Sequence, residues 1–304
     1  MEEVIQVIAA CLRLMKWRLR PPCLRRLQTD ILALCSGMRA VIMVDYGGKM
    51  PELKHQLCAF IRLCHKESSI FKHLRVMVID DMIYLIHVQG LAQLVKSTFN
   101  SEVELHFVDI EQDPPKVIYF LPMSFQMITK TENSSLGNEL IAIQELFALA
   151  FPDDAADRDY LHCQTTDTVT TSESSTITSE FIDLSSCMQD TLVTVPTLNG
   201  WLLGYPVVYL FRRECISDAI YNLSTQSLRI YRVLVTRNET SMKGSQQEEL
   251  MSFSVPYDLS VEGSDEAWAT TFMATMQAKL DKSGQFWGSM KLEVSSCYPQ
   301  SVVL

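Results

Sequence analysis

The stretch that decides the fold lies in the second half of the chain, where Leu198–Phe211 reads LNGWLLGYPVVYLF. It combines two glycines, one proline and four aromatic residues with a short β-branched run. Glycine and proline interrupt regular structure, whereas consecutive valines favour a strand, so the pattern predicts a turn that leads into a buried strand. The stretch contains no acid, no base and no nucleophile, which indicates a place in the core and not in a reaction.

Outward from this stretch, the chain alternates between helical and strand-like apolar spacing. Helices are expected over 4–20, 24–36, 51–66, 90–99, 138–151, 215–223 and a final segment capped by Ser264. Strands are expected over 40–44, 74–80, 82–88, 103–108, 116–121, 191–195, 204–211, 228–236, 251–255, 286–294 and 298–304. The order predicts an α/β fold (α+β mixed), with one mixed β-sheet core, helices packed on its faces and a single globular domain over 1–304.

Composition changes sharply between Pro152 and Glu180. This segment holds eleven Ser or Thr residues, several acidic residues and one basic residue, and its apolar periodicity is lost. Such a composition predicts a flexible Ser/Thr/acid-rich insert, 152–180, within the domain. Thr170 is a candidate phosphorylation site, because Glu173 follows at the spacing that acid-directed kinases read. The simpler alternative is a solvated loop without a regulatory role.

Bulk composition limits the classes of function. The net charge of −10 argues against a nucleic-acid partner, which would need a positive face. Nine scattered cysteines without a C-x-x-C pair fit free thiols in a reducing compartment. The acidic N-terminus lacks the features of a signal peptide, and no apolar run is long enough to span a membrane. We therefore expect a soluble, intracellular protein, cytoplasmic or nuclear and not secreted.

One string resembles the opening of a nucleotide or S-adenosylmethionine site. Val44 ends an apolar run and is followed by Asp45, Tyr46, Gly47 and Gly48, and a helix is expected next. A strand, a glycine turn and a helix N-terminus are the parts that such a site needs. Asp80, after a later strand, could hold a ribose hydroxyl. The third glycine is missing and the spacing to Asp80 is long, so a topological turn capped by Asp45 is the alternative.

Metal and nucleophile patterns are weak. His55, Cys58 and His65 lie on one flank of the helix expected over 51–66, but Cys58 and His65 are two turns apart, which is far for one zinc ion. Asp45, Asp80 and Asp81 could bind magnesium if the strand ends converge, although turn and cap roles are the simpler explanation. His162 and Cys163 fall in the predicted insert, where rigid positioning is poorest. The sequence thus predicts no catalytic residue, no metal and no cofactor.

Two strings together suggest a relationship. VDYGG at Val44–Gly48 and LNGWLLGYPVVY at Leu198–Tyr209 resemble an uncharacterised vertebrate family designated as an open reading frame on human chromosome 1, a domain of unknown function. The resemblance covers most of the chain. It implies a single intracellular domain and assigns no activity, cofactor or catalytic residue.

Two hypotheses follow from these patterns. The first is a non-catalytic protein-interaction module with an unidentified protein partner and a phosphoregulated insert. The second is a degenerate nucleotide- or S-adenosylmethionine-binding enzyme that uses the Asp45–Gly48 turn. If the carboxylates of Asp45, Asp80 and Asp81 line an open pocket together with the turn, the second hypothesis gains support. If side chains fill the space at the turn, the second hypothesis is wrong.

Overall fold

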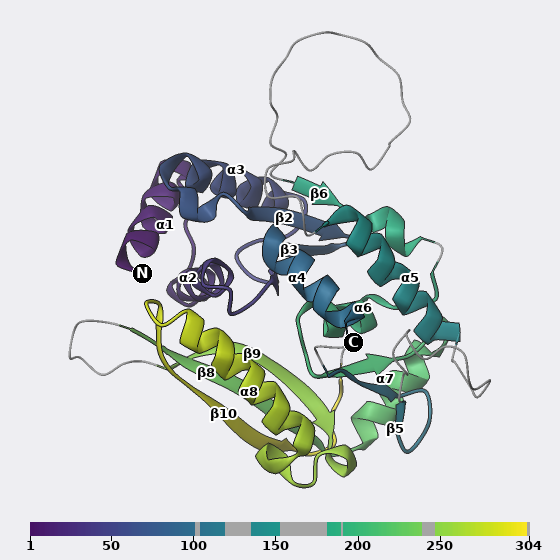
Figure 1. The fold of residues 1–304 in the computed structure, drawn as a ribbon. Helices are drawn as coiled ribbons and strands as arrows, with labels where there is room; N and C mark the ends of the chain where they lie inside the picture. Colours follow the sequence, from purple (N-terminus) through teal and green to yellow (C-terminus); the bar gives the residue numbers. More distant parts are fainter. Residues whose placement is uncertain (101–103, 119–134, 153–180, 190, 239–246, 303–304) are drawn as a thin grey trace, which may run out of the picture.

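The structure is a computed structural model that describes residues 1–302 apart from 101–103, 119–134, 153–180, 190 and 239–246 (Figure 1). Its helices are α1 (Glu2–Met15), α2 (Pro21–Cys35), α3 (Glu52–Glu67), α4 (Val88–Phe99), α5 (Ser135–Ala150), α6 (Val195–Leu202), α7 (Ile216–Thr225) and α8 (Ala267–Lys282). Its strands are β1 (Val41–Met43), β2 (Leu74–Ile79), β3 (Met82–His87), β4 (His106–Asp109), β5 (Lys116–Ile118), β6 (Phe181–Asp183), β7 (Val207–Leu210), β8 (Leu228–Arg237), β9 (Gln247–Pro256) and β10 (Trp287–Cys297). No described helix is both long and apolar enough to cross a membrane.

The α/β class is confirmed, but the described strands form three sheets and not the single mixed sheet that we expected. Their strand orders are β1-β3-β2-β6, β5-β4-β7 and β10-β8-β9. Periodicity identifies a strand without identifying its neighbour, because the hydrogen bonds that join strands form between residues distant in sequence.

The first sheet separates two hydrophobic clusters. β2 and β3 form an antiparallel hairpin, and successive side chains of a strand point to opposite faces. Val76 and Val78 belong to the cluster that includes α1, α2 and α3, whereas Met77 and Ile79 belong to the cluster with α4, α5 and α6. The nearly unbroken apolar run of β2 is therefore explained by burial on both faces.

The third sheet is antiparallel, with β8 between β9 and β10, and α8 covers one of its faces (Figure 1). The rings of Tyr231 and Phe253 stack with centroids 5.4 Å apart, and Trp268 of α8 lies against both rings. The other face carries polar cross-strand neighbours, among them Arg232 and Glu293. This sheet is thus buried on one face only, as the alternation of apolar and polar residues requires.

The Leu198–Phe211 stretch is only partly as predicted. Its first half is the end of α6 and not a turn, and the strand β7 starts at Val207. Gly200 fits the helix because α6 approaches β7 closely: a Cβ atom on Gly200 would lie 3.1 Å from Cγ1 of Val208. Thr194 caps the helix by accepting a hydrogen bond from the backbone of Thr197. Tertiary packing therefore overrides the low helix propensity of glycine.

The strands expected over 191–195 and 298–304 are also absent where the structure describes those residues. Residues 195 onward are helical, and 298–302 form no strand. By contrast, β10 runs three residues beyond the predicted end at Val294, to Cys297, because it pairs with the whole of β8.

Candidate functional site

The Asp45–Gly48 turn follows β1 as expected, but side chains of the same chain lie against its glycine. Gly47 has a φ of 85°, a conformation that glycine adopts without strain. A Cβ atom on Gly47 would lie 3.0 Å from Cδ2 of Leu19 and 3.5 Å from Cζ2 of Trp17. These two side chains occupy space beside the glycine backbone that a bound phosphate would need. Cofactor binding by this turn stays a prediction.

The carboxylates proposed to assist the turn lie at the same end of the first sheet. β1 and β2 are both antiparallel to β3, so they run in the same direction with β3 between them. Asp45 follows β1 and Asp80 follows β2, and both residues therefore lie at the end of the sheet where these two strands terminate. Asp80 has a φ of 51° and lies in the tight turn between β2 and β3. Its backbone N–H donates to Oγ of Ser185 at 3.0 Å. This bond joins the hairpin turn to the segment that follows β6.

The zinc candidates remain on the flank of α3. Nε2 of His65 lies 3.0 Å from the carbonyl oxygen of Leu74, while His55 is exposed and Cys58 is half-buried. Among the residues that the structure describes, no group of three His, Cys, Asp or Glu side chains is placed to hold a metal ion. Thr170, His162 and Cys163 lie outside the described residues, as does the predicted insert from residue 153 onward.

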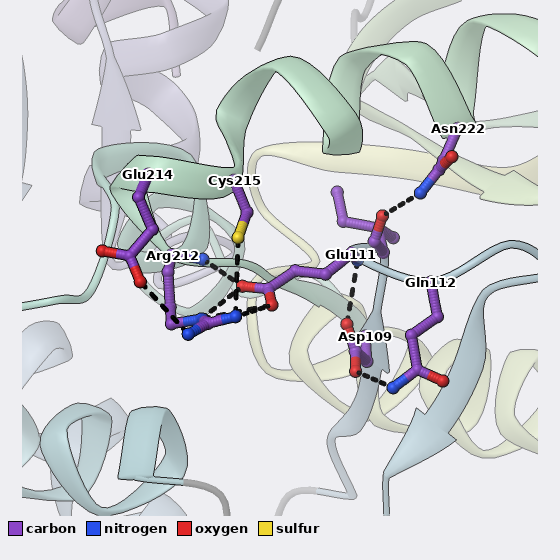
Figure 2. Close-up of polar contacts among 8 residues, drawn as sticks. Asp109, Glu111, Gln112, Arg212, Glu214, Cys215 and Asn222 are labelled. Atoms are coloured by element: carbon purple, nitrogen blue, oxygen red, sulfur yellow. Dashed lines mark hydrogen bonds and ion pairs between the residues drawn. The ribbon is translucent and has the colours of Figure 1, made fainter.

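A group of ionisable residues that the sequence patterns did not single out meets beyond β4 and β7 (Figure 2). These two strands are parallel, and Glu111 and Arg212 follow their carboxyl ends. In open α/β sheets, ligands commonly bind at the carboxyl ends of parallel strands. Cys215 lies next to the pair, immediately before α7. Its position in the fold makes this group a candidate for a ligand-binding or catalytic site.

Glu111 and Arg212 form a bidentate ion pair. Nη2 of Arg212 lies 2.7 Å from Oε2 of Glu111, and Nε lies 3.0 Å from Oε1. The backbone N–H of Arg212 also donates to Oε1, at 2.6 Å. These bonds hold the pKa of Glu111 below its usual value and raise the pKa of Arg212. Both groups are therefore fully ionised at neutral pH, and each charge is neutralised by the other.

Cys215 is not activated by its neighbours. Nη2 of Arg212 lies 3.5 Å from its Sγ, which would favour a thiolate, but partial burial and the negative charge of Glu111 act in the opposite direction. Their combined effect raises the pKa of the Cys215 thiol. A thiol nucleophile needs a lowered pKa, so the arrangement does not favour nucleophilic chemistry at this cysteine.

Further hydrogen bonds connect this group to the surrounding elements of the fold. Asp109 accepts a hydrogen bond of 2.9 Å from the backbone N–H of Glu111, and Asn222 of α7 donates to the carbonyl oxygen of Ile110 at 3.0 Å (Figure 2). The segment after β4 is thus tied to both β7 and α7. Because Glu111 and Arg212 are 101 positions apart, no local pattern signals their contact.

A second set of charges is buried between the first and third sheets. Asp30 of α2 is 1% exposed; its Oδ1 lies 3.2 Å from Nε of Arg26, and its Oδ2 accepts a 2.6 Å hydrogen bond from Tyr46. Burial dominates over these partners and raises the pKa of Asp30. Tyr46 belongs to the glycine turn, so this network fixes the turn to α2.

Arg39 joins three segments. Arg39 is 6% exposed, and its guanidinium donates to the carbonyl oxygens of Leu250 at 3.0 Å and Leu203 at 3.1 Å. Leu250 lies at an irregularity in the pairing of β8 and β9, and the neighbouring carbonyl of Glu249 accepts from Arg26 at 3.0 Å. Side chains from the first half of the chain therefore satisfy carbonyls of β9 that no strand pairs.

The two edges of the third sheet differ. On β9, the carbonyl of Ser254 also accepts a 2.8 Å hydrogen bond, from the hydroxyl of Tyr209. On β10, the described part of the chain supplies no pairing strand other than β8, and Figure 1 draws β10 along the rim of the molecule. An open edge of eleven residues presents backbone N–H and C=O groups on which another strand can pair.

The fold and these contacts define an α/β protein in which the most prominent ionisable groups hold elements together. The model of one family, described as Domain of unknown function (DUF4504), matches residues 9–304, so the chain belongs to that family. No curated protein and no solved structure matches the chain significantly.

Proposed function

We propose that this chain is a non-catalytic protein-interaction module and that it binds another polypeptide through the outer edge of β10. The observation that carries the proposal is the open edge itself. β10 pairs on one side with β8 over Trp287–Cys297, and its other side has no partner strand in the described part of the chain. Strand addition to such an edge is a common mode of peptide recognition, in which backbone hydrogen bonds supply affinity.

The state of the ionisable groups supports the same reading. Glu111 and Arg212 neutralise each other, and the raised pKa of Cys215 keeps its thiol protonated. Asp30 and Arg39 are buried and hydrogen-bonded. Groups that are already paired in this way stabilise a scaffold more readily than they perform acid–base or nucleophilic steps.

Residues 152–180 would regulate the module. A phosphate on Thr170 adds close to two negative charges, which repel an acidic neighbour and attract an arginine. Phosphorylation by an acid-directed kinase, with Thr170→Ala as the control, tests whether this residue accepts phosphate. In mass spectrometry, the peptide that contains position 170 should gain the mass of a phosphate in the wild-type chain and not in the variant. A phosphate on both would place the modification at another residue.

The proposed location and origin follow the same reasoning. We infer a cytoplasmic or nuclear protein, because the free thiols of the described cysteines suit a reducing compartment. Within its family, we infer membership of the vertebrate group designated as an open reading frame on human chromosome 1, from the strings VDYGG and LNGWLLGYPVVY.

A photo-crosslinking amino acid introduced on the chain in cells tests the proposed function. Placed at Lys291, an exposed position in β10, it should form a specific adduct with a protein. Placed at Lys66, an exposed position in α3, it should not. If both positions give the same adduct in equal yield, or if Lys291 gives no adduct, the proposed interaction through β10 is contradicted.

A further inference from the structure

The sequence of β10 is nearly symmetric about its central residue, Leu292. Reading Trp287–Cys297 as WGSMKLEVSSC, Lys291 and Glu293 flank the centre, and Met290 and Val294 lie one step further out. Ser289 and Ser295 come next on the two sides. An antiparallel pairing of two identical strands about Leu292 would therefore place opposite charges, two apolar residues and two serines against each other.

We propose that two copies of this chain pair through their β10 edges, antiparallel, about a two-fold axis at Leu292. The pairing joins two three-stranded sheets into one six-stranded sheet. It rests on the proposed function and names the partner as a second copy of the chain. A two-fold axis is the commonest symmetry of soluble dimers, and it repeats each contact twice.

The charges fix the register of this pairing. With Leu292 on the axis, Lys291 faces Glu293 of the second copy, and the symmetry gives two such pairs per dimer. An axis at Lys291 would set two lysines against each other, and an axis at Glu293 would set two glutamates against each other. A shift of one residue in the pairing would place apolar side chains opposite charged ones. The observed order of charges thus favours a single alignment.

The two faces of the strand agree with the same alignment. Met290, Leu292 and Val294 are half-buried and pack against the core on the face that α8 covers. Lys291 and Glu293 are exposed on the other face. Because directly opposed residues of antiparallel strands share a face, the apolar face of one copy continues into that of the other. The charge pairs then lie together on the solvent side.

β9 cannot offer an equivalent edge. Arg26, Arg39 and Tyr209 already donate hydrogen bonds to its carbonyl groups at Glu249, Leu250 and Ser254. A strand added there would have to displace the buried guanidinium of Arg39 and the half-buried one of Arg26. The self-pairing therefore belongs to β10.

Sedimentation equilibrium of the full chain over a wide range of concentrations tests the proposal. The wild-type chain should show a reversible monomer–dimer equilibrium. Lys291→Glu should weaken the dimer by about tenfold, since it turns both charge pairs into repulsive ones. Glu293→Lys should weaken it similarly, and the double variant Lys291→Glu/Glu293→Lys should restore most of the affinity.

Two further variants distinguish the edge from other causes. Lys66→Glu makes the same charge change on α3 and should leave the dimer intact. Leu292→Pro removes a backbone donor and should abolish dimers. Circular dichroism shows whether this variant remains folded, and Lys291→Glu tests the same edge without a proline. A wild-type chain that stays monomeric, or a dimer indifferent to Lys291→Glu, overturns the self-pairing. Specific crosslinks from Lys291 to a different protein, with the chain monomeric, would preserve the module and reject only the second copy.

Discussion

The hydroxyl of Tyr46 donates a 2.6 Å hydrogen bond to the carboxylate of Asp30, which is 1% exposed. The bond connects the glycine turn after β1 to the middle of α2. It also supplies a donor to a buried carboxylate that forms an ion pair with Arg26, at 3.2 Å. A string that resembles a ligand-binding turn thus has a structural anchor in the fold.

Tyr46→Phe should destabilise the chain by about 1–3 kcal/mol, because the buried carboxylate of Asp30 loses a hydrogen-bond donor. Urea unfolding at neutral pH measures the change. Tyr221→Phe is the matched control, since Tyr221 is 65% exposed on α7 and its loss of a hydroxyl should cost little. Equal stability of the two variants would show that the Tyr46 bond contributes nothing measurable.

Arg39→Met should cost about 2–4 kcal/mol of unfolding free energy, because the carbonyls of Leu203 and Leu250 both lose their donor. Arg39→Lys should recover only part of this, as a single ammonium group cannot reproduce the planar fork of a guanidinium. Arg232→Met is the control: Arg232 is 43% exposed, and its pairing with Glu249 is a surface contact. A loss in Arg232→Met as large as that in Arg39→Met would contradict the assigned role.

Acid should destabilise the chain through His87. Burial, followed by the neighbouring His73, lowers the pKa of His87 to about 4, and burial also lowers the pKa of His73. Below the ordinary histidine pKa the unfolded chain takes up a proton that the folded chain does not. Stability is therefore complete near neutral pH and falls as the pH drops through 6.5 towards 4, by an amount on the order of 2 kcal/mol after allowance for partial solvation.

His87→Asn isolates this effect. Nδ1 of His87 accepts a 3.1 Å hydrogen bond from the backbone N–H of Gly90 at the start of α4, and an asparagine oxygen can serve as the same cap. Urea unfolding at a series of pH values should show a shallower acid loss in the variant than in the wild-type chain. Parallel curves would mean that other groups govern the acid response.

The thiols of Cys11, Cys35 and Cys64 should resist alkylation in the folded chain. Burial raises the pKa of all three, that of Cys35 to about 12, so almost no thiolate exists near neutral pH. Mass spectrometry after brief labelling should find these residues unmodified until urea unfolds the chain. Cys23, half-buried on α2, is the internal control and should react first. Early labelling of Cys64 would require local opening between α1 and α3.

Nucleotides, S-adenosylmethionine and divalent ions should leave the melting temperature unchanged, because Leu19 and Trp17 lie against the Gly47 backbone. Thermal-shift measurements detect any ligand that binds only the folded state. A rise that Gly47→Ala abolishes, in a variant that remains folded, would restore the cofactor-binding hypothesis for the turn.

The sequence by itself determined the local structure well where periodicity is strong. The apolar arc Leu53, Leu57, Phe60, Ile61 and Cys64 is buried on α3, and the strands expected over 74–80 and 82–88 form as β2 and β3. In these cases the same residues favour the element locally and bury it globally. The Leu198–Leu202 segment was misassigned, because its glycine and asparagine argue against a helix that β7 nevertheless supports by packing on Gly200.

Only the tertiary structure decided which strands share a sheet, which charges meet and which strand edge has no partner among the described residues. Glu111 meets Arg212 across 101 positions, and Arg39 meets Leu250 across 211. Hydrogen bonds and ion pairs act over a few ångströms in space and carry no trace in local periodicity. The near-symmetry of β10 was visible in the sequence from the start, but it gained meaning only when the fold left that strand at the rim of its sheet.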